Sequence, residues 1–353
     1  MQFKKLKIAF VTGAVLANLV SSVNVLADNS FIAGLVKSSI LLDIDVSETT
    51  TIVGERGHVL VSATKSADFV QVSVPTKTTL TGVTSNQDRR WAVGHDATIL
   101  YSPDKGQSWQ VQLEMPELDR PFLDVLFFDK QHGIAVGAYG LFYRTKDAGQ
   151  TWRKELHASV LPQDDIDYLE TVKSDINFYN EELSFILPHF NRLSYANGRL
   201  IMSGEAGLIA FSDDLGVNWQ RQEIDYQGSF FDAVTLENNV IIAAGLRGNL
   251  YAKQAASDEW EHIETCITTS LSSIINGDGD KLIVTGNNGV LLAIEKQTLF
   301  TDKRNSANSD SCNRSAAVTM VTTGINDAIL NAAYFDNQLV AVTASGIKQL
   351  SVK

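Results

Sequence analysis

A single pattern recurs seven times along this chain of 353 residues and restricts what the chain can fold into. Each copy is an apolar strand, a Gly-x-x-Gly turn or a near variant of it, and a second strand of alternating character. Glycine suits such a turn because a tight hairpin needs positive φ and room for close backbone approach. The first turn position falls at Gly54, Gly94, Gly137, Gly204, Gly245, Gly286 and Thr343, with spacings of 40, 43, 67, 41, 41 and 57 residues.

A second motif, S/T-x-D-x-G-x-x-W, follows three of these units and matches the Asp-box of bacterial neuraminidase repeats. In each copy the aspartate can accept backbone N–H bonds within the turn, the glycine allows the reversal, and the tryptophan packs between sheets. A degraded fourth copy ends at Trp260. We therefore expect a structural role, not a catalytic one, for the residues of the three complete boxes: Asp104, Gly106, Trp109, Asp147, Gly149, Trp152, Asp214, Gly216 and Trp219.

The repeat length indicates the fold. A further apolar segment precedes each Gly-x-x-Gly strand, so each repeat supplies about four short strands in roughly 41 residues, the size of one β-propeller blade. We predict an all-β fold, a seven-bladed β-propeller of four-stranded antiparallel blades that forms a single domain over residues 28–353. The last repeat provides three strands, and we expect residues 30–37 to pair with it and close the ring.

Two of the spacings exceed the repeat length and mark insertions at about residues 155–190 and 295–326. The first insertion has apolar residues in a three-to-four rhythm and an excess of Asp and Glu, which predicts a short helical insertion. Two interpretations stay open for it. It is either a solvated acidic helix packed on the rim of the propeller or an element that docks a partner.

Residues 1–27 have the pattern of a signal peptide. Lys4, Lys5 and Lys7 precede an apolar stretch that ends in small residues near Ala27, as in secretory leaders. The alternative is a transmembrane anchor. We expect cleavage near Ala27, a periplasmic or secreted location, and a mature chain that does not span the membrane and is a monomer.

The charge of the chain argues against nucleic-acid binding. There are 29 Lys+Arg and 41 Asp+Glu residues, a formal charge of −12. Removal of the leader takes away three lysines and leaves 26 basic residues against 41 acidic ones, or −15. Affinity for phosphate backbones depends on clustered Lys and Arg, and no basic cluster compensates locally.

The chain has two cysteines, Cys266 and Cys312. Export would place them in an oxidising compartment where a disulfide persists, so we predict a bond between them; two free or buried thiols are the alternative. Neither cysteine has a spacing suited to zinc, and we expect no metal and no cofactor.

The turns also indicate a binding surface. In a four-stranded blade, the hairpin between the second and third strands lies on the face where the crossover enters the next blade, so all seven turns surround one mouth of the central channel. The scaffold repeats while the turn side chains vary, as a recognition surface requires. A solvated set of unrelated turn residues and a small ligand in the channel are the alternatives. The predicted partner-binding residues are Glu55, Arg56, His58, His95, Asp96, Tyr139, Glu205, Arg247 and Asn249.

The runs VGERGHVLVS, LTGVTSNQDRRWAVGHDATILYS and FLDVLFFDKQHGIAVGAYGLFYRTKDAGQTW closely resemble exported bacterial members of the photosystem II stability/assembly factor family. The resemblance covers essentially residues 40–300. It implies a seven-bladed propeller that acts as a noncatalytic assembly or accessory factor and binds other envelope or membrane proteins. Photosynthetic members engage a membrane-protein subunit through a basic surface. A charge of −15 departs from that pattern, so the photosystem role itself is not carried over.

The Asp-boxes also raise an enzymatic alternative, a sialidase-like glycoside hydrolase acting on extracellular glycans. Arg56, Arg247, Tyr139, Glu205 and Asp96 resemble parts of the catalytic set of such enzymes. The Phe-Arg-Ile-Pro signature of the family is absent and only two arginines occupy the turns. We therefore expect no enzymatic activity and no catalytic residue.

Overall fold

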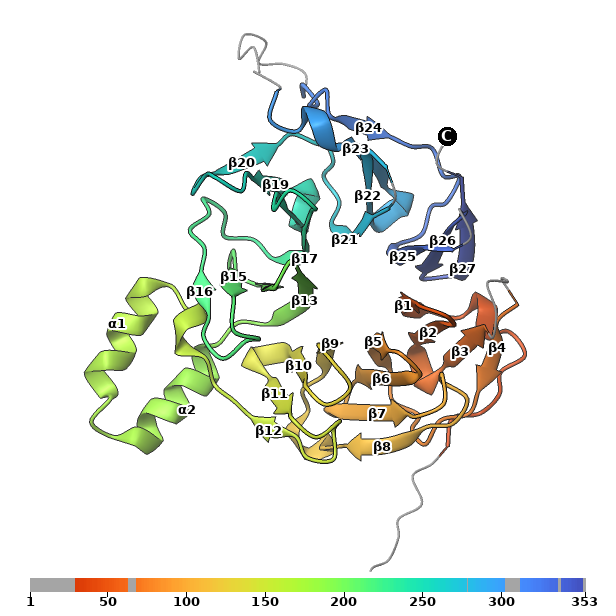
Figure 1. The fold of residues 1–353 in the computed structure, drawn as a ribbon, viewed down its shortest axis with the longest axis horizontal. Helices are drawn as coiled ribbons and strands as arrows, with labels where there is room; N and C mark the ends of the chain where they lie inside the picture. Colours follow the sequence, from red (N-terminus) through yellow and green to blue (C-terminus); the bar gives the residue numbers. More distant parts are fainter. Residues whose placement is uncertain (1–28, 63–67, 278, 302–311, 336–337, 352–353) are drawn as a thin grey trace, which may run out of the picture.

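Seven antiparallel β-sheets stand around a central channel as the blades of a propeller (Figure 1). The computed structural model describes residues 29–62, 68–277, 279–301, 312–335 and 338–351. Within these ranges six blades have four strands and the last has three. The seven-bladed all-β prediction is therefore confirmed, and the four-stranded prediction holds for six blades. The expected leader at residues 1–27 lies outside the described residues.

The first strand of each blade lines the channel and later strands follow outward (Figure 1). Blades one to four consist of β1 (Leu41–Val46), β2 (Thr50–Gly54), β3 (Val59–Ser62) and β4 (Val70–Val72); β5 (Leu80–Asn86), β6 (Arg89–Gly94), β7 (Thr98–Ser102) and β8 (Gln110–Leu113); β9 (Phe122–Phe127), β10 (Gly133–Gly137), β11 (Phe142–Thr145) and β12 (Arg153–Lys154); and β13 (Phe190–Ala196), β14 (Arg199–Gly204), β15 (Ile209–Ser212) and β16 (Gln220–Arg221). Blades five to seven consist of β17 (Phe230–Thr235), β18 (Ile241–Gly245), β19 (Leu250–Lys253) and β20 (Trp260–Ile263); β21 (Leu271–Asn276), β22 (Lys281–Gly286), β23 (Leu291–Glu295) and β24 (Val318–Met320); and β25 (Ile329–Phe335), β26 (Gln338–Thr343) and β27 (Gly346–Leu350).

The core lies between neighbouring blades. Second strands such as β2 and β10 are buried along their whole length, as expected for strands covered on both faces. Between blades three and four, for example, Trp219 packs with Ile134 and Phe142 in one apolar cluster. Each blade therefore buries apolar side chains against the next one.

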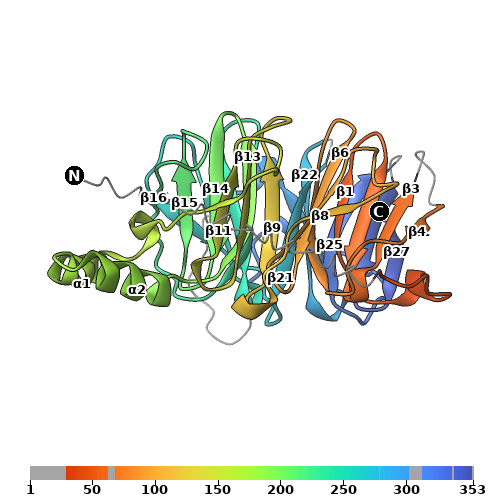
Figure 2. The same cartoon turned by 90° about the horizontal axis from the view of Figure 1, so that it is seen from below.

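The first insertion is helical, as predicted. It consists of α1 (Gln163–Val172) and α2 (Ile176–Ile186), which project from the rim as a hairpin (Figure 2). Asp175 caps α2 by accepting the N–H groups of Asn177 and Phe178 at 3.1 and 3.2 Å. Leu169 of α1 and Leu183 of α2 are buried in the apolar cluster between blades three and four and so anchor the hairpin. No helix in the described ranges is long and apolar enough to cross a membrane.

The prediction that residues 30–37 form the fourth strand of blade seven is wrong. The N–H of Ser30 donates to the carbonyl of Val74 at 2.8 Å, and the Ser30 hydroxyl accepts from the N–H of Val74 at 2.9 Å, so the segment begins on blade one and forms no strand on blade seven. It continues into the 3₁₀ helix η1 (Val36–Ser38). The physical reason is apolar burial, because Val36 packs at the seam between blades seven and one with Phe69 and Phe335.

Candidate binding surface

The Gly-x-x-Gly turns bond each blade to its own entry segment and to the next blade. In blade one the N–H of Glu55 donates to the carbonyl of Ile40 at 3.1 Å, and the N–H of Gly57 donates to Thr78, at the entry of blade two, at 2.7 Å. Blade four repeats this arrangement through Glu205 and Gly207. The turns therefore surround the end of the channel at which the inner strands begin. We call this end the turn face.

Close backbone approach explains the glycines. A Cβ atom on Gly54 would collide with the carbonyl oxygen of Ile40. Gly57 has a φ of 68°, and a Cβ there would collide with the carbonyl oxygen of Thr76. Positive φ and a backbone neighbour together admit only glycine at such a position.

The structure separates the predicted partner-binding residues into two groups. Most are exposed or half-exposed on the turn face: Glu55, Arg56, His95, Asp96, Tyr139, Glu205 and Arg247. His58 is only 2% exposed, and burial lowers the pKa of its imidazole. The Asn249 amide donates to the carbonyl of Leu246 at 2.8 Å and so braces its own turn. His58 thus supports its turn from inside and presents little surface to a partner, whereas Asn249 braces its turn and remains half-exposed.

Two of the predicted residues meet through a third side chain. The Tyr139 ring, 52% exposed, lies edge-on to the ring of His189 with 4.4 Å between centroids. His189 Nδ1 lies 3.3 Å from Glu205 Oε1. The Arg120 guanidinium lies 5.3 Å from the centroid of the Tyr139 ring, and its Nη1 donates to the Tyr139 carbonyl at 3.3 Å. We call these four residues the Tyr139 cluster.

Arg120 and His189 were not predicted from the sequence. Both lie in crossovers that enter an inner strand, Arg120 two residues before β9 and His189 directly before β13. The crossovers share the turn face with the hairpins, so the one or two residues before an inner strand also reach this surface.

The helical insertion lies beside the Tyr139 cluster. The N–H of Gly140 donates to the carbonyl of Pro188, just after α2, at 2.9 Å. On α2 itself Phe178 is 43% and Phe185 80% exposed. Large exposed apolar side chains near a recognition surface are typical of interaction sites. The hairpin therefore extends the turn face with aromatic surface.

The glycosidase set does not assemble into one site. Contacts join Tyr139 to Glu205 through His189. Arg56 and Arg247 stand on the turns of blades one and five, and Arg56 lies 3.8 Å from its neighbour Glu55. A carboxylate-binding arginine cluster next to the tyrosine is therefore not formed by these residues.

The channel contains a charged cluster that was not predicted. Its members occupy the equivalent position, directly after a bulge, in five inner strands: Asp43, Asp124, Arg192, Asp232 and Asn331. Asp43 Oδ1 lies 3.2 Å from Arg192 Nη1 and accepts from the Asn331 amide at 2.6 Å.

The carboxylates of this cluster also join neighbouring blades. Asp43, Asp124 and Asp232 accept the N–H groups of the next inner strand, from Val83, Leu193 and Ile274, at 2.8, 2.7 and 2.7 Å. Burial raises the pKa of Asp124 to about 7 and also raises that of Asp232. Burial opposes the charge of Arg192, yet the three carboxylates together hold its pKa above its usual value. The interior of the channel is thus structural and acidic.

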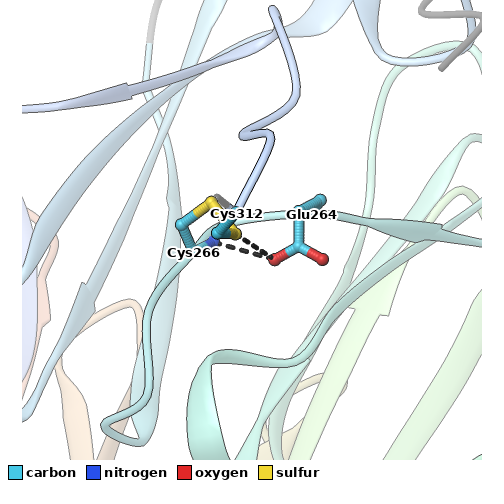
Figure 3. A group of neighbouring side chains, drawn as sticks. All are labelled: Glu264, Cys266 and Cys312. Atoms are coloured by element: carbon cyan, nitrogen blue, oxygen red, sulfur yellow. Dashed lines mark hydrogen bonds between the residues drawn. A yellow bond between two sulfur atoms is a disulfide. The ribbon is translucent and has the colours of Figure 1, made fainter. Parts of the chain in front are cut away.

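Cys266 and Cys312 form the predicted disulfide, with an S–S distance of 2.00 Å (Figure 3). The Glu264 carboxylate beside them accepts the N–H of Cys266 at 3.0 Å. A metal would need thiolates at this place, and the two sulfurs are bonded to each other. The group of three side chains is therefore a staple between the second insertion and blade five.

Comparison with known proteins agrees with this architecture. No family model matches the chain. A stretch of 59 residues is 30% identical to the photosystem II assembly protein Ycf48 of Synechococcus sp. (strain JA-2-3B'a(2-13)), covering 17% of this chain and 18% of that protein, less than a fifth of its length. Solved structures share the fold. One, described as YCF48 bound to D1 peptide, has a TM-score of 0.64 at 13% identity and covers 90% of this chain and 95% of its own.

The second, YCF48 from Cyanidioschyzon merolae, has a TM-score of 0.61 at 14% identity and covers 88% of this chain and 95% of its own. The WD40 propeller of Doa1 has a similar TM-score of 0.61 at 10% identity, covering 93% of this chain and 97% of its own. Identities this low show the fold alone, and the sequence match adds one stretch of direct similarity. The resemblance predicted from the sequence is confirmed as a similarity: the chain is a seven-bladed propeller that resembles YCF48 in fold and, over 59 residues, Ycf48 in sequence.

Proposed function

We propose that this protein is a noncatalytic, exported accessory factor whose turn face binds an extended segment of an envelope or membrane protein. The Tyr139 cluster is the observation that carries this proposal. It offers a half-exposed aromatic ring that contacts both a guanidinium group and a histidine–carboxylate pair. The aromatic ring can stack on a side chain of a bound peptide, and the guanidinium and imidazole groups can donate hydrogen bonds to the peptide's backbone carbonyl groups.

Two further observations support the proposal. A propeller of the same fold, YCF48, has been solved with a D1 peptide bound, so this scaffold accommodates peptide ligands. The leader-like pattern at residues 1–27 and the disulfide between Cys266 and Cys312 both fit an oxidising compartment outside the cytoplasm.

The test combines crosslinking with a matched pair of tyrosine variants. A photoreactive residue in place of the exposed Arg56 captures the partner in the native envelope, and its affinity is then measured with purified protein. Tyr139→Ala is expected to weaken binding by about tenfold or more, as for an aromatic interface anchor. Tyr195, 42% exposed and also edge-on to a neighbouring ring, lies at the far end of β13 and is the control.

Unchanged binding by Tyr195→Ala together with weaker binding by Tyr139→Ala supports the turn face. Equal effects of the two substitutions, or none, would contradict it. Export is tested separately, because mass spectrometry of the mature protein is expected to find its first residue near Asp28. An intact leader would overturn the exported location without affecting the binding test.

A further inference from the structure

Six blades share a feature that the described residues of blade seven do not show. In each of them an aromatic side chain packs against the preceding blade, and it stands in the connection before the fourth strand, directly before that strand, or at its first residue. Trp219 of blade four lies on Ile134 and Phe142 of blade three, and Trp260 of blade five lies on Ile201 and Phe211 of blade four. The six residues, in blade order, are Phe69, Trp109, Trp152, Trp219, Trp260 and Phe300.

Blade seven stops at its third strand in the described part of the chain. The sheet order is β25-β26-β27, and no described strand pairs with the outer edge of β27. In every other blade that edge is covered by a strand of two to four residues, as β12 and β8 illustrate. An open edge presents unpaired N–H and C=O groups to any extended chain.

A cavity lies where the missing connection would be. In blades one and three, the residue three positions before the first turn glycine contacts the Asp-box of the next blade. A Cβ on Gly106 would lie 3.5 Å from Thr51 Oγ1, and one on Gly216 would lie 2.8 Å from Ile134 Cδ1. The equivalent residue of blade six, Ile283, lines a cavity of about 700 Å³ instead.

The cavity has the character of the buried interfaces elsewhere in the ring. Ile283 of blade six and Leu339 and Leu350 of blade seven provide apolar walls. Lys281 and Glu295, with 3.1 Å between Nζ and Oε1, stand at its rim. An apolar side chain entering this site would be covered on one side by each blade.

We propose that the edge of β27 and this cavity receive an extended segment of a second protein, which adds the fourth strand of blade seven and inserts an aromatic side chain over Ile283. The six complete blades define the occupant: a short antiparallel strand with an aromatic residue before it or at its first position. Strand addition of this kind supplies main-chain hydrogen bonds and a pocket for side-chain selection. The described start of this chain is bonded to blade one through Ser30 and Val74. Its 3₁₀ helix η1 reaches only the first end of β27, where Lys37 lies against Gly346, and it adds no strand to that edge.

This site is independent of the turn face. Hairpins between the second and third strands lie at one end of each blade, and connections between the third and fourth strands lie at the other. One protein can therefore hold a partner at each end, and failure of one site leaves the other intact.

The experiment uses a peptide that copies the chain's own blade-four segment, residues 211–222 (FSDDLGVNWQRQ). The control peptide has alanine in place of the residue equivalent to Trp219. Binding to the full mature protein is measured by calorimetry, and the bound site is located by amide hydrogen exchange. We expect protection of residues 347–350, and binding at least about tenfold weaker for the control peptide because it lacks the buried aromatic group. Gln338→Trp, at the exposed rim of the cavity, is expected to weaken binding of the first peptide.

Four results would overturn the proposal. No binding, or equal binding of both peptides, would remove strand addition at this edge. A dimer in which residues 347–350 are already protected would assign the edge to a second copy of the chain. Protection of these residues only when residues 1–27 are retained would assign it to the chain's own N-terminal segment.

Discussion

Arg192 of blade four reaches across the channel to Asp43 of blade one, with 3.2 Å between Nη1 and Oδ1, although 149 positions separate them in the sequence. Asp124 and Asp232 lie close enough to the same guanidinium to raise its pKa. One cation thus balances three carboxylates that themselves bond neighbouring blades. The ring is closed from its centre by this cluster as well as by packing at the seam.

Replacement of Arg192 is expected to destabilise the whole ring. Arg192→Met leaves three buried carboxylates without their cation, and loss of one partner of a buried ion pair costs about 3 kcal/mol of unfolding free energy. Arg199→Ala is the control, because Arg199 and its partner Asp213 are 42% and 67% exposed and a surface pair contributes less than about 1 kcal/mol. Urea unfolding measures the unfolding free energy of both variants. Equal losses of unfolding free energy would contradict a larger stabilising contribution from the channel cluster than from the surface ion pair.

The protein is expected to lose stability as the pH rises, because the buried carboxyl group of Asp45 must then give up its proton. Burial raises the pKa of Asp45 to about 6, and one of its carboxylate oxygens has no hydrogen-bond partner among the described residues. The folded state therefore holds a proton that the unfolded chain, with a carboxyl pKa of 3.8, has released. The contribution is fully present below that value and is lost as the pH rises through 6.

A difference measurement isolates this effect, because burial lowers the pKa of His58 and His157 and those groups act in the opposite direction. Between pH 5 and 7.5 the unfolding free energy of the wild type is expected to fall relative to that of Asp45→Asn. Asp258→Asn, at an exposed position, is expected to follow the wild type at every pH. Parallel curves for wild type and Asp45→Asn would contradict the raised pKa.

The sequence was sufficient for features that repeat locally. The turn glycines and Asp-boxes recur at a nearly fixed spacing, so each copy predicts one blade independently of the others. The helical insertion followed from its own periodicity. His58 shows where inference from local sequence fails. As a polar residue directly after a turn it was expected to be exposed, but it is buried. Leu141 and Leu208 occupy the equivalent positions and are buried, and an alignment of the repeats would have indicated that this position faces inward.

The remaining features depend on contacts between distant segments. The channel position carries Asp43, Arg192 or Asn331 in different blades, and only the closed ring brings these residues together. The segment at residues 30–37 lies at the seam between blades seven and one, where Val36 is buried among apolar side chains. It does not pair with the open edge of β27. Strand pairing outside the repeat therefore could not be predicted from the repeat pattern.

The Asp-box aspartates are expected to stabilise their turns without affecting binding. Asp214 accepts the N–H and the side-chain amide of Asn218 at 2.9 and 2.6 Å and the Ser212 hydroxyl at 2.8 Å. Backbone bonds from Asn218 lead the interactions that lower its pKa to about 2. Asp214→Ala is expected to lower the unfolding free energy by about 1 kcal/mol. The neighbouring Asp213→Ala is the control, and a larger loss there would contradict the structural role of the box.

The disulfide is expected to stabilise the protein by constraining its unfolded state. Cys266 and Cys312 are 46 residues apart, and closing a loop of that length contributes about 4 kcal/mol in the chain-entropy model. Replacing both cysteines by serine is expected to lower the thermal midpoint, and a reducing agent is expected to lower that of the wild type to a similar value while leaving the variant unchanged. The Glu264 carboxylate stays in place in all three samples, so its contribution cancels in the comparison. A wild type that is insensitive to reduction, beside a destabilised double variant, would show that the serine substitutions act through packing and not through the loss of the bond.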